Sequence, residues 1–537
     1  MNIKIPALSF IKLMFHKFLS QRVNILLTIV LFYILIAIYQ ISYPGLQYDE
    51  VLFSNVALKV IDPSTFVYSR FAGIPIMVMA YIGALKSYLY LPIFALFGTS
   101  VWTVRLPVIL LTALGLFLLG IVIKKKYGWK VSLISLLLLV LNPAFISLTR
   151  ADVGPIVIEV FLKIIAIGVG LKMIQTLKEK TKGNSTRQLL LWTALLSFVF
   201  TLGVFNKINF IWFVNAFVGA GIFAYWKDIF AFIREKKAFL ASGIISVLIA
   251  IPYALFAYIS IKGNAFGLIP APYDPINSFR NILLALSGIG FIDIVYVRVS
   301  PILYVPLGLL MLLLFVIAFV KAFRQREDFT IFLGGIVLLS LAQIFLTKNA
   351  QALWHSFIIF PMVMIVIATY FNDIKMQIRQ IHLKGVFLGG ILTVYSMLSL
   401  YQLSIITQEP YSVVWSPKIY DLVEETKAHD FSYISLDWAI HTQLLTLNPV
   451  EGKYREDFWT INTLEEKELG QFVLDRYITD DQWKNQRFIV FTQTEDIRTV
   501  TSLREELNKK GFDLVIEKRI PQQDSTYTVS KITQVTY

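Results

Sequence analysis

Long apolar stretches separated by short polar segments dominate the first 406 residues of the chain. Each stretch is about 20 residues long, the length an α-helix needs to cross the hydrocarbon core of a membrane. We predict eleven spans, near residues 23–42, 101–123, 130–149, 153–174, 188–205, 208–226, 238–260, 301–321, 329–347, 352–371 and 385–406. The pattern therefore predicts a polytopic α-helical membrane protein.

The segment of residues 43–100, between the first two predicted spans, is apolar but interrupted by several prolines and glycines. These breaks favour short helices at the membrane surface over one straight span, although residues 71–97 are an alternative twelfth span. Upstream, lysines interleave with apolar residues as in an interfacial amphipathic helix. The run at 23–42 is too long for a signal-peptide core and has no small-residue cleavage pattern, so we predict a retained first helix.

The pattern changes at residue 407, where short alternating segments replace the long apolar stretches. Asp437 and His441 lie four residues apart as a possible catalytic pair, but we favour a helix capped by Asp437 with His441 on its exposed face. We divide the chain into a membrane domain, residues 1–406, and a C-terminal α/β domain, residues 407–537. In that domain we predict helices over 418–428 and 498–510, strands over 431–436 and 487–492, and a hairpin of 513–519 and 525–533.

Charge adds an orientation to this pattern. Residues 1–406 carry 34 Lys and Arg against 13 Asp and Glu, whereas residues 407–537 carry 15 against 22. The positive charge lies in alternate short loops, so the positive-inside rule places the N-terminus in the cytoplasm and the C-terminal domain outside.

No basic face with interleaved aromatic residues appears, which argues against nucleic-acid binding. The chain has no cysteine, which excludes disulfides and thiolate metal sites.

Two acidic motifs stand at the predicted outer surface. Tyr48-Asp49-Glu50 follows the first span directly, and Arg150-Ala-Asp152 ends the third. Carboxylates this close to lipid are costly and are usually kept for a task. The alternatives are a solvated loop start and a charge that only marks the end of a span. Glu159 and Lys163, four residues apart within the next span, are predicted to pair, with packing favoured over catalysis.

Several cations lie at the same predicted surface. Together they would suit binding of a phosphate or pyrophosphate. The alternative is that each long side chain only places its charged group in water and binds no ligand. A carboxylate can take a proton from an acceptor hydroxyl, and cations can stabilise a leaving phosphate. The pattern therefore predicts group transfer from a lipid-linked phosphate, with Asp49, Glu50 and Asp152 as catalytic residues. The candidate phosphate ligands are Lys86, Arg105, Arg150, Lys207, Lys348 and His355.

These motifs resemble those of the GT-C membrane glycosyltransferases, in particular the protein O-mannosyltransferase and lipid A aminoarabinose transferase group. The resemblance rests on Tyr48-Asp49-Glu50, on the passage from Tyr81 to Pro107 that includes Leu96-Phe-Gly98 and Trp102-Thr-Val-Arg105-Leu-Pro107, on Arg150-Ala-Asp152, and on Trp354-His355 before Pro361. The chain lacks the Lys-Pro-Pro or His-Pro-Pro run that many relatives carry before the passage ending in Gly98, and Lys86 would take the place of that lysine.

The resemblance implies inverting transfer of a sugar from a polyprenyl-phosphate donor, without a cofactor or metal. Asp49 would be the general base, and Glu50 and Asp152 would position acceptor and donor. Lys207, Lys348 and His355 would meet the donor phosphate. The acceptor would be a lipid, a glycan or a protein. The protein would lie in the inner membrane of a cell. The alternatives are a transporter or flippase of lipid-linked sugars, and a non-catalytic component of envelope assembly.

Overall fold

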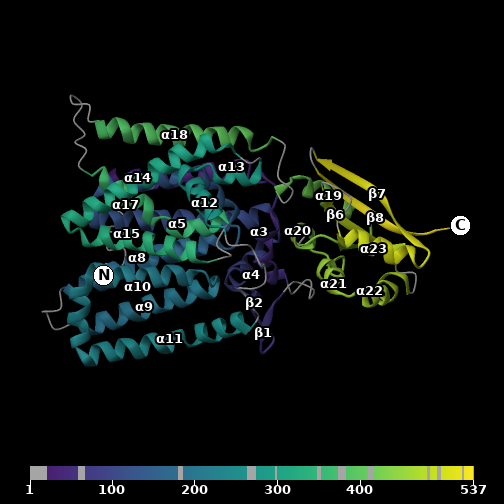
Figure 1. Ribbon diagram of the computed structural model, residues 1–537, viewed down its shortest axis with the longest axis horizontal. Coiled ribbons are helices and arrows are strands. Elements are labelled where there is room, and N and C mark those ends of the chain that lie inside the picture. The colour runs from purple at the N-terminus through teal and green to yellow at the C-terminus, as the bar shows by residue number, and fades with distance from the viewer. Residues whose placement is uncertain are drawn as a thin grey trace, which may run out of the picture.

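The computed structural model shows a bundle of helices that carries an α/β domain at one end (Figure 1). The chain is a polytopic helical membrane protein with a C-terminal α/β domain. The residues described are 21–58, 67–178, 185–262, 274–296, 299–347, 352–372, 383–408, 415–438, 440–479, 484–492, 498–522 and 525–535. The predicted interfacial helix ahead of residue 21 lies outside them.

The bundle is built from apolar helices, and each predicted span coincides with one helix or one bent pair. Among the described residues, six helices are long and apolar enough to cross a membrane, or eight if each bent pair is one span. The count of eleven spans therefore stays a prediction. The helices are α2 (Gln21–Ile38), α5 (Val101–Tyr127), α6 (Trp129–Val140), α7 (Pro143–Ala151), α8 (Ile156–Lys178), α9 (Ser185–Asn206), α10 (Phe210–Arg234), α11 (Lys236–Lys262), α12 (Pro275–Ser287), α13 (Gly290–Val295), α14 (Pro301–Gln325), α15 (Asp328–Leu346), α16 (Leu353–Ser356), η3 (Phe357–Ile359), α17 (Met362–Tyr370) and α18 (Leu383–Ile405).

Two of the predicted spans are bent. Helices α6 and α7 meet at 68°, and the segment α16–η3 meets α17 at 52°. At the first bend the Asn142 side chain accepts a hydrogen bond from the Phe145 amide at 2.9 Å, and Pro143 follows at the first helical position. A side-chain cap followed by proline starts a new helix in a new direction. Helix α7 therefore ends with Arg150 and Asp152 at the end of the bundle that carries the α/β domain.

The segment between α2 and α5 differs from its prediction. It contains the short helices α3 (Tyr48–Leu52), η1 (Asn55–Leu58) and α4 (Leu85–Phe97), but residues 69–83 form a three-stranded sheet of β1 (Ser69–Phe71), β2 (Ile74–Met79) and β3 (Ile82–Gly83). Ala72 and Gly73 both have positive φ, as a two-residue hairpin turn requires. A span over 71–97 is wrong, because its first part is a sheet and α4 has only 13 residues.

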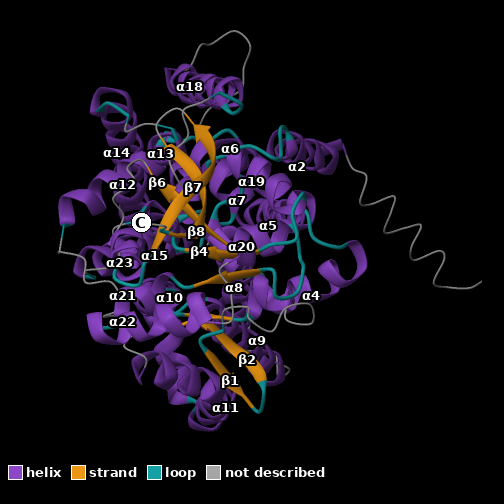
Figure 2. Cartoon of the chain, turned by 90° about the vertical axis from the view of Figure 1, so that its right-hand side faces the viewer, coloured by secondary structure: helices purple, strands orange, loops and turns teal. Residues whose placement is uncertain are grey.

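The C-terminal domain is a five-stranded sheet covered by helices on both faces (Figure 2). The order is β5-β4-β6-β8-β7, with β4 parallel to both neighbours and the last three strands antiparallel. Its elements are α19 (Lys418–Lys427), β4 (Ser432–Ser435), α20 (Ile440–Leu447), β5 (Tyr454–Glu456), α21 (Phe458–Thr463), α22 (Glu466–Val473), η5 (Leu474–Ile478), β6 (Gln486–Thr492), α23 (Arg498–Asn508), β7 (Phe512–Gln522) and β8 (Ser525–Gln534).

Every element predicted for this domain is present within a few residues of its expected bounds. The position of His441 was not predicted correctly: its side chain is buried, and its Nδ1 lies 3.1 Å from Glu456 Oε2. Alternation of apolar residues identifies strands reliably, but it does not show which face of the following helix a neighbouring strand will cover.

The C-terminal domain packs directly on the short helix α3. Leu46 and Val51 share one apolar core with Leu422 and Leu444 of the domain. Polar contacts reinforce it: Asn55 Nδ2 donates to the Thr442 carbonyl at 3.3 Å, and Asn55 Oδ1 accepts from the Thr446 hydroxyl at 2.6 Å. Because α3 follows α2 by only a short connection, this packing fixes the domain against one end of the bundle.

Candidate functional site

Asp49 lies in the first turn of α3, where its backbone amide donates to Gln47 Oε1 at 2.7 Å. As a residue, Asp49 is half-buried. Desolvation raises the pKa of Asp49 to about 6, against the opposing effect of the Lys207 and Lys86 ammonium groups. A carboxyl group with a pKa in this range is ionised at neutral pH and can still accept a proton, as a general base must.

The connection that leads to α3 is held by its backbone carbonyls. All eight carbonyls from residue 39 to residue 46 accept a hydrogen bond from a side chain elsewhere in the chain. We call this arrangement the carbonyl clamp. The donors are Arg150 to residues 39, 40 and 43, Arg105 to residues 41, 44 and 45, Tyr420 to residue 42 and Gln443 to residue 46. The clamp fixes the start of α3 and hence the position of Asp49.

Glu50 faces away from Asp49 and forms a buried pair with Arg105. Arg105 Nε donates to Glu50 Oε2 and Nη2 to Oε1, both at 2.7 Å, and neither side chain is more than 1% exposed. With the clamp bonds, all five N–H groups of Arg105 are in use. Arg105 therefore has no N–H group left for the phosphate that the sequence predicted it to bind. Glu50, expected to be a catalytic residue, instead holds Arg105 in place.

Lys86 and Asp152 form a second buried pair in the same region. Lys86 Nζ lies 2.8 Å from Asp152 Oδ2 and donates to the Glu50 carbonyl at 3.0 Å. Asp152 is the left-handed residue that ends α7, and its Oδ1 accepts from the Val157 amide at 2.7 Å. Lys86 thus links α4, α3 and the α7–α8 turn, and it brings Asp152 to the neighbourhood of Asp49.

Lys207 completes the group from the turn between α9 and α10. Its Nζ donates to the Gly154 carbonyl at 3.1 Å, and the side chain is 3% exposed. Burial lowers the pKa of the Lys207 ammonium, while the carboxylates of Glu159, Asp49 and Asp152 oppose that shift. We call Asp49, Lys86, Asp152 and Lys207 the acid–lysine cluster. Their convergence on one end of the bundle was predicted from the sequence.

Tyr81 is a member of this region that the sequence did not single out. The Ile208 amide donates to the Tyr81 carbonyl at 2.9 Å, which joins β3 to the Lys207 turn. Burial raises the pKa of the Tyr48 and Tyr81 phenols, and the Asp49 charge raises each further. Both phenols therefore stay protonated beside Asp49 and can donate a hydrogen bond. The sequence feature that could have indicated this contact is Gly83, because two backbones can approach this closely only where one of them carries glycine.

Glu159 and Lys163 do not form the predicted pair. Lys163 Nζ donates instead to the carbonyls of Phe357 and Ile358, at 2.9 and 3.3 Å. Glu159 is 4% exposed, and its Oε1 has no hydrogen-bond partner among the residues that the structure describes. Lys163 instead satisfies two buried carbonyls at the bend between η3 and α17, because a broken helix leaves backbone acceptors that need a donor.

The remaining candidates contribute less to this site. The Arg150 guanidinium belongs to the carbonyl clamp. His355 lies in α16 with its ring edge-on to Trp212, at 6.0 Å between ring centres. Lys348 lies outside the described residues. Within the described part of the chain, no three His, Cys, Asp or Glu side chains are grouped to hold a metal ion, and metal-independent transfer stays a prediction.

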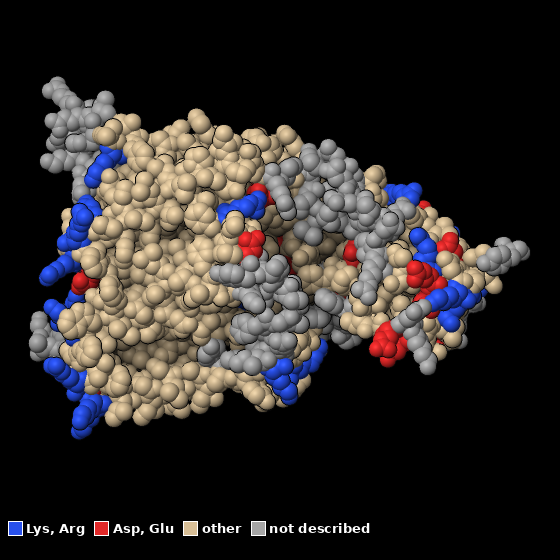
Figure 3. All heavy atoms as spheres, viewed as in Figure 1, with Lys and Arg blue, Asp and Glu red and all other residues tan. Residues whose placement is uncertain are grey.

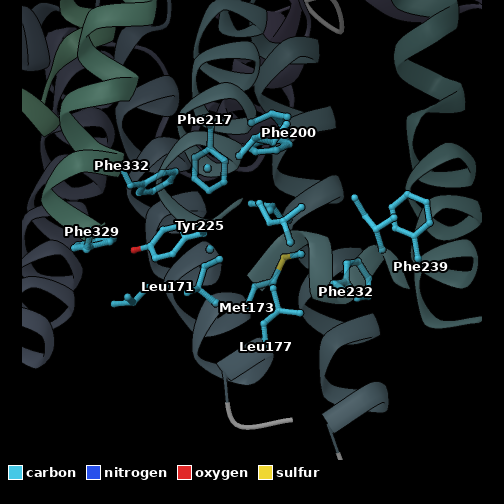
Figure 4. Close-up of a pocket in the computed structure, with 18 residues that line it drawn as sticks. Leu171, Met173, Leu177, Phe200, Phe217, Tyr225, Phe232, Phe239, Phe329 and Phe332 are labelled. Carbon is cyan, nitrogen blue, oxygen red and sulfur yellow. The ribbon is translucent and has the colours of Figure 1, made fainter. Parts of the chain in front are cut away.

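A large apolar cavity of about 350 Å³ lies elsewhere in the bundle (Figure 4). It lies between α8, α9, α10, α11 and α15, and Phe200, Phe217 and Phe332 project into it. Its α8 residues begin at Gly170, eleven residues beyond Glu159, which is about 16 Å along a helix. The residues that line the cavity carry no charge. The cavity therefore suits acyl or isoprenoid chains and offers no groups for acid–base catalysis.

Comparison with known proteins identifies the architecture. No protein-family model and no curated protein sequence matches the chain. The crystal structure of ArnT from Cupriavidus metallidurans in the apo state superposes with a TM-score of 0.59 and 11% identity, over 94% of this chain and 97% of that one. The chain has the same fold as ArnT. The resemblance inferred from the motifs is confirmed at this level.

Two further structures share this fold. ArnT bound to undecaprenyl phosphate gives a TM-score of 0.58 at 10% identity, over 94% of this chain and 97% of that one. The archaeal oligosaccharyltransferase AglB from Archaeoglobus fulgidus, in complex with an inhibitory peptide and a dolichol-phosphate, gives 0.51 at 11% identity, over 94% of this chain and 74% of that one. Both complexes contain a polyprenyl-type phosphate.

Proposed function

We propose that this protein is a glycosyltransferase that moves a sugar from a polyprenyl-phosphate donor to an acceptor hydroxyl at the outer face of the cytoplasmic membrane. The observation that carries the proposal is the acid–lysine cluster, in which two buried lysines act on the Asp49 carboxyl group. A base beside phosphate-binding cations is what transfer from a phosphate donor requires. The shared fold with ArnT and AglB, both found with lipid phosphates, supports the donor class.

In the proposed reaction, Asp49 accepts the proton of the acceptor hydroxyl. The freed oxygen bonds to the anomeric carbon from the face opposite the donor phosphate, so the configuration inverts. The bond between that carbon and the phosphate oxygen breaks, and the polyprenyl phosphate leaves with the bonding electrons. Lys86 and Lys207 stabilise the charge that develops on the leaving phosphate, because fixed cations in a desolvated site act strongly on it.

The other candidate residues take supporting parts in this proposal. Asp152 orients Lys86 through their contact of 2.8 Å. Glu50, Arg105 and Arg150 hold α3 in place through their buried bonds. His355 and Lys348 remain proposed ligands of the donor phosphate. Residues 1–406 form the catalytic membrane domain, and residues 407–537 the exoplasmic domain.

The distribution of charge on the surface supports this orientation. Figure 3 shows Lys and Arg side chains along the end of the bundle opposite the C-terminal domain. Cytoplasmic loops of inner-membrane proteins carry this excess of cations. The acid–lysine cluster lies at the other end and would face the outside, where sugar nucleotides are absent and a lipid-linked donor is needed.

The test is transfer by the full-length protein in which Asp49 is replaced. We expect Asp49→Asn to reduce transfer at least 100-fold, the lower range for loss of a general base, with expression and insertion unchanged. Envelope glycans from complemented deletion cells, compared by mass spectrometry, provide the measurement. Asp421→Asn is the matched control, because Asp421 lies on the exposed side of α19, paired with Lys418. Full transfer by Asp49→Asn would refute the assignment. Intact transfer with loss of lipid-linked sugar export would favour the flippase.

A further inference from the structure

The C-terminal sheet has a topological switch point at the carboxyl ends of β4 and β6. After β4 the chain continues into α20, whose Leu444 and Leu445 pack with Tyr433 and Ile489 on one face. After β6 it reaches α23, which packs on the opposite face. The residues of that second core include Ile434, Phe488, Val490, Leu503 and Leu507. Connections that leave neighbouring parallel strands toward opposite faces open a crevice, and α/β domains bind ligands there.

The segment that follows β4 contacts the start of α3, beside the acid–lysine cluster. Trp438 lies three residues after the end of β4, and its ring centre lies 4.7 Å from that of Tyr48, the residue before Asp49. Figure 1 shows α20, the helix that follows Trp438, beside α3. Figure 3 shows the surface hollowed between the bundle and the C-terminal domain. Tyr48, Asp437 and Trp438 are all partly exposed. The contact between Trp438 and Tyr48 therefore brings the chain that follows β4 close to the proposed base.

We propose that this corner, formed by Asp437, Trp438 and Tyr48, binds the acceptor as a saccharide and presents one of its hydroxyls to Asp49. The proposal rests on the proposed function and names the class of its acceptor. Sugar rings present apolar C–H faces, which pack on the negative faces of aromatic rings. Their hydroxyls donate to carboxylates such as Asp437, and a few convergent polar groups beside apolar surface are typical of small-ligand sites.

The sheet geometry distinguishes a saccharide from a peptide acceptor. A peptide bound by strand addition needs a free sheet edge. The strands that end at this crevice, β4 and β6, are each paired on both sides, β4 with β5 and β6, and β6 with β4 and β8. The sheet edges are β5 and β7. The corner therefore offers side chains and rings, but no unpaired strand.

Replacement of Trp438 tests the proposal on the full-length protein in detergent. We expect Trp438→Ala to weaken binding to an arrayed library of neutral and phosphorylated oligosaccharides roughly tenfold, about the contribution of one aromatic contact, and Trp438→Phe to retain most of it. In transfer assays the acceptor KM should rise by a similar factor, while kcat changes little. Binding of undecaprenyl phosphate should be unchanged in both variants.

The controls separate this proposal from the function on which it rests. Trp226→Ala removes an exposed tryptophan from α10 and should leave all readouts at wild-type values. Thermal unfolding checks that Trp438→Ala is folded; if it is not, Asp437→Asn must show the same rise in acceptor KM. Wild-type saccharide binding and acceptor KM in the folded variants, or binding to a peptide array in place of the oligosaccharides, would overturn the proposal. Full transfer by Asp49→Asn would instead refute the proposed function.

Discussion

Asp49 and Glu50 are adjacent, but their side chains have different environments. Glu50 is fully buried against Arg105, whereas Asp49 is partly exposed and influenced by two lysines. The sequence predicted that adjacent side chains on a helix point apart. It did not show which would meet an arginine, because Arg105 comes from α5, 55 residues away. For the same reason, four of the six candidate cations divide into two clamp arginines and two cluster lysines only in the structure.

The pKa of Asp49 leads to a prediction about pH. The proposed base must be ionised, and its pKa of about 6 is raised above the ordinary value of a carboxyl group by desolvation. Transfer should therefore be near its maximum at pH 7 and fall as pH drops through 6, by about tenfold per unit below that. The measurement is kcat/KM between pH 4.5 and 8 for purified protein. A flat profile across that range would contradict the assignment.

At the scale of elements, local pattern predicted the helices and the C-terminal strands, but not the sheet before α4. The strands β2 and β3 are short and apolar, so their composition resembles a membrane segment. They are fixed by contact with a distant element: a Cβ on Gly83 would lie 2.0 Å from the Phe205 carbonyl oxygen at the end of α9. Periodicity within a segment cannot reveal such a contact.

Gly83→Ala should separate β3 from the Lys207 turn. The added methyl group has no room beside the Phe205 carbonyl, so the backbones must shift, which costs about 1–3 kcal/mol of folding free energy. We expect a lower unfolding temperature and transfer reduced at least tenfold, because Lys207 moves relative to Asp49. Gly389→Ala in α18 is the control, since nothing lies within 4 Å of its added Cβ. Wild-type transfer by a folded Gly83→Ala protein would contradict this role of the contact.

At the scale of the molecule, alternating charge in the loops predicted an orientation that the fold itself does not test. The absence of cysteine makes a direct test simple. Cysteine placed at Asp421, in the C-terminal domain, should react with an impermeant maleimide in right-side-out membrane vesicles. Cysteine placed at Lys125, at the end of α5, should react only after the vesicles are opened. The reverse pattern would place the proposed site in the cytoplasm and exclude the outer-face reaction.

The carbonyl clamp has a consequence for engineering hybrid proteins. Two of its donors, Tyr420 and Gln443, come from the C-terminal domain, and the rest come from α5 and α7. A chimera that receives this domain from another protein would lose part of the support for Asp49 unless the graft supplies equivalent donors at both positions. Exchanging the domain to change acceptor preference should therefore succeed only when these two side chains are transplanted with the new surface.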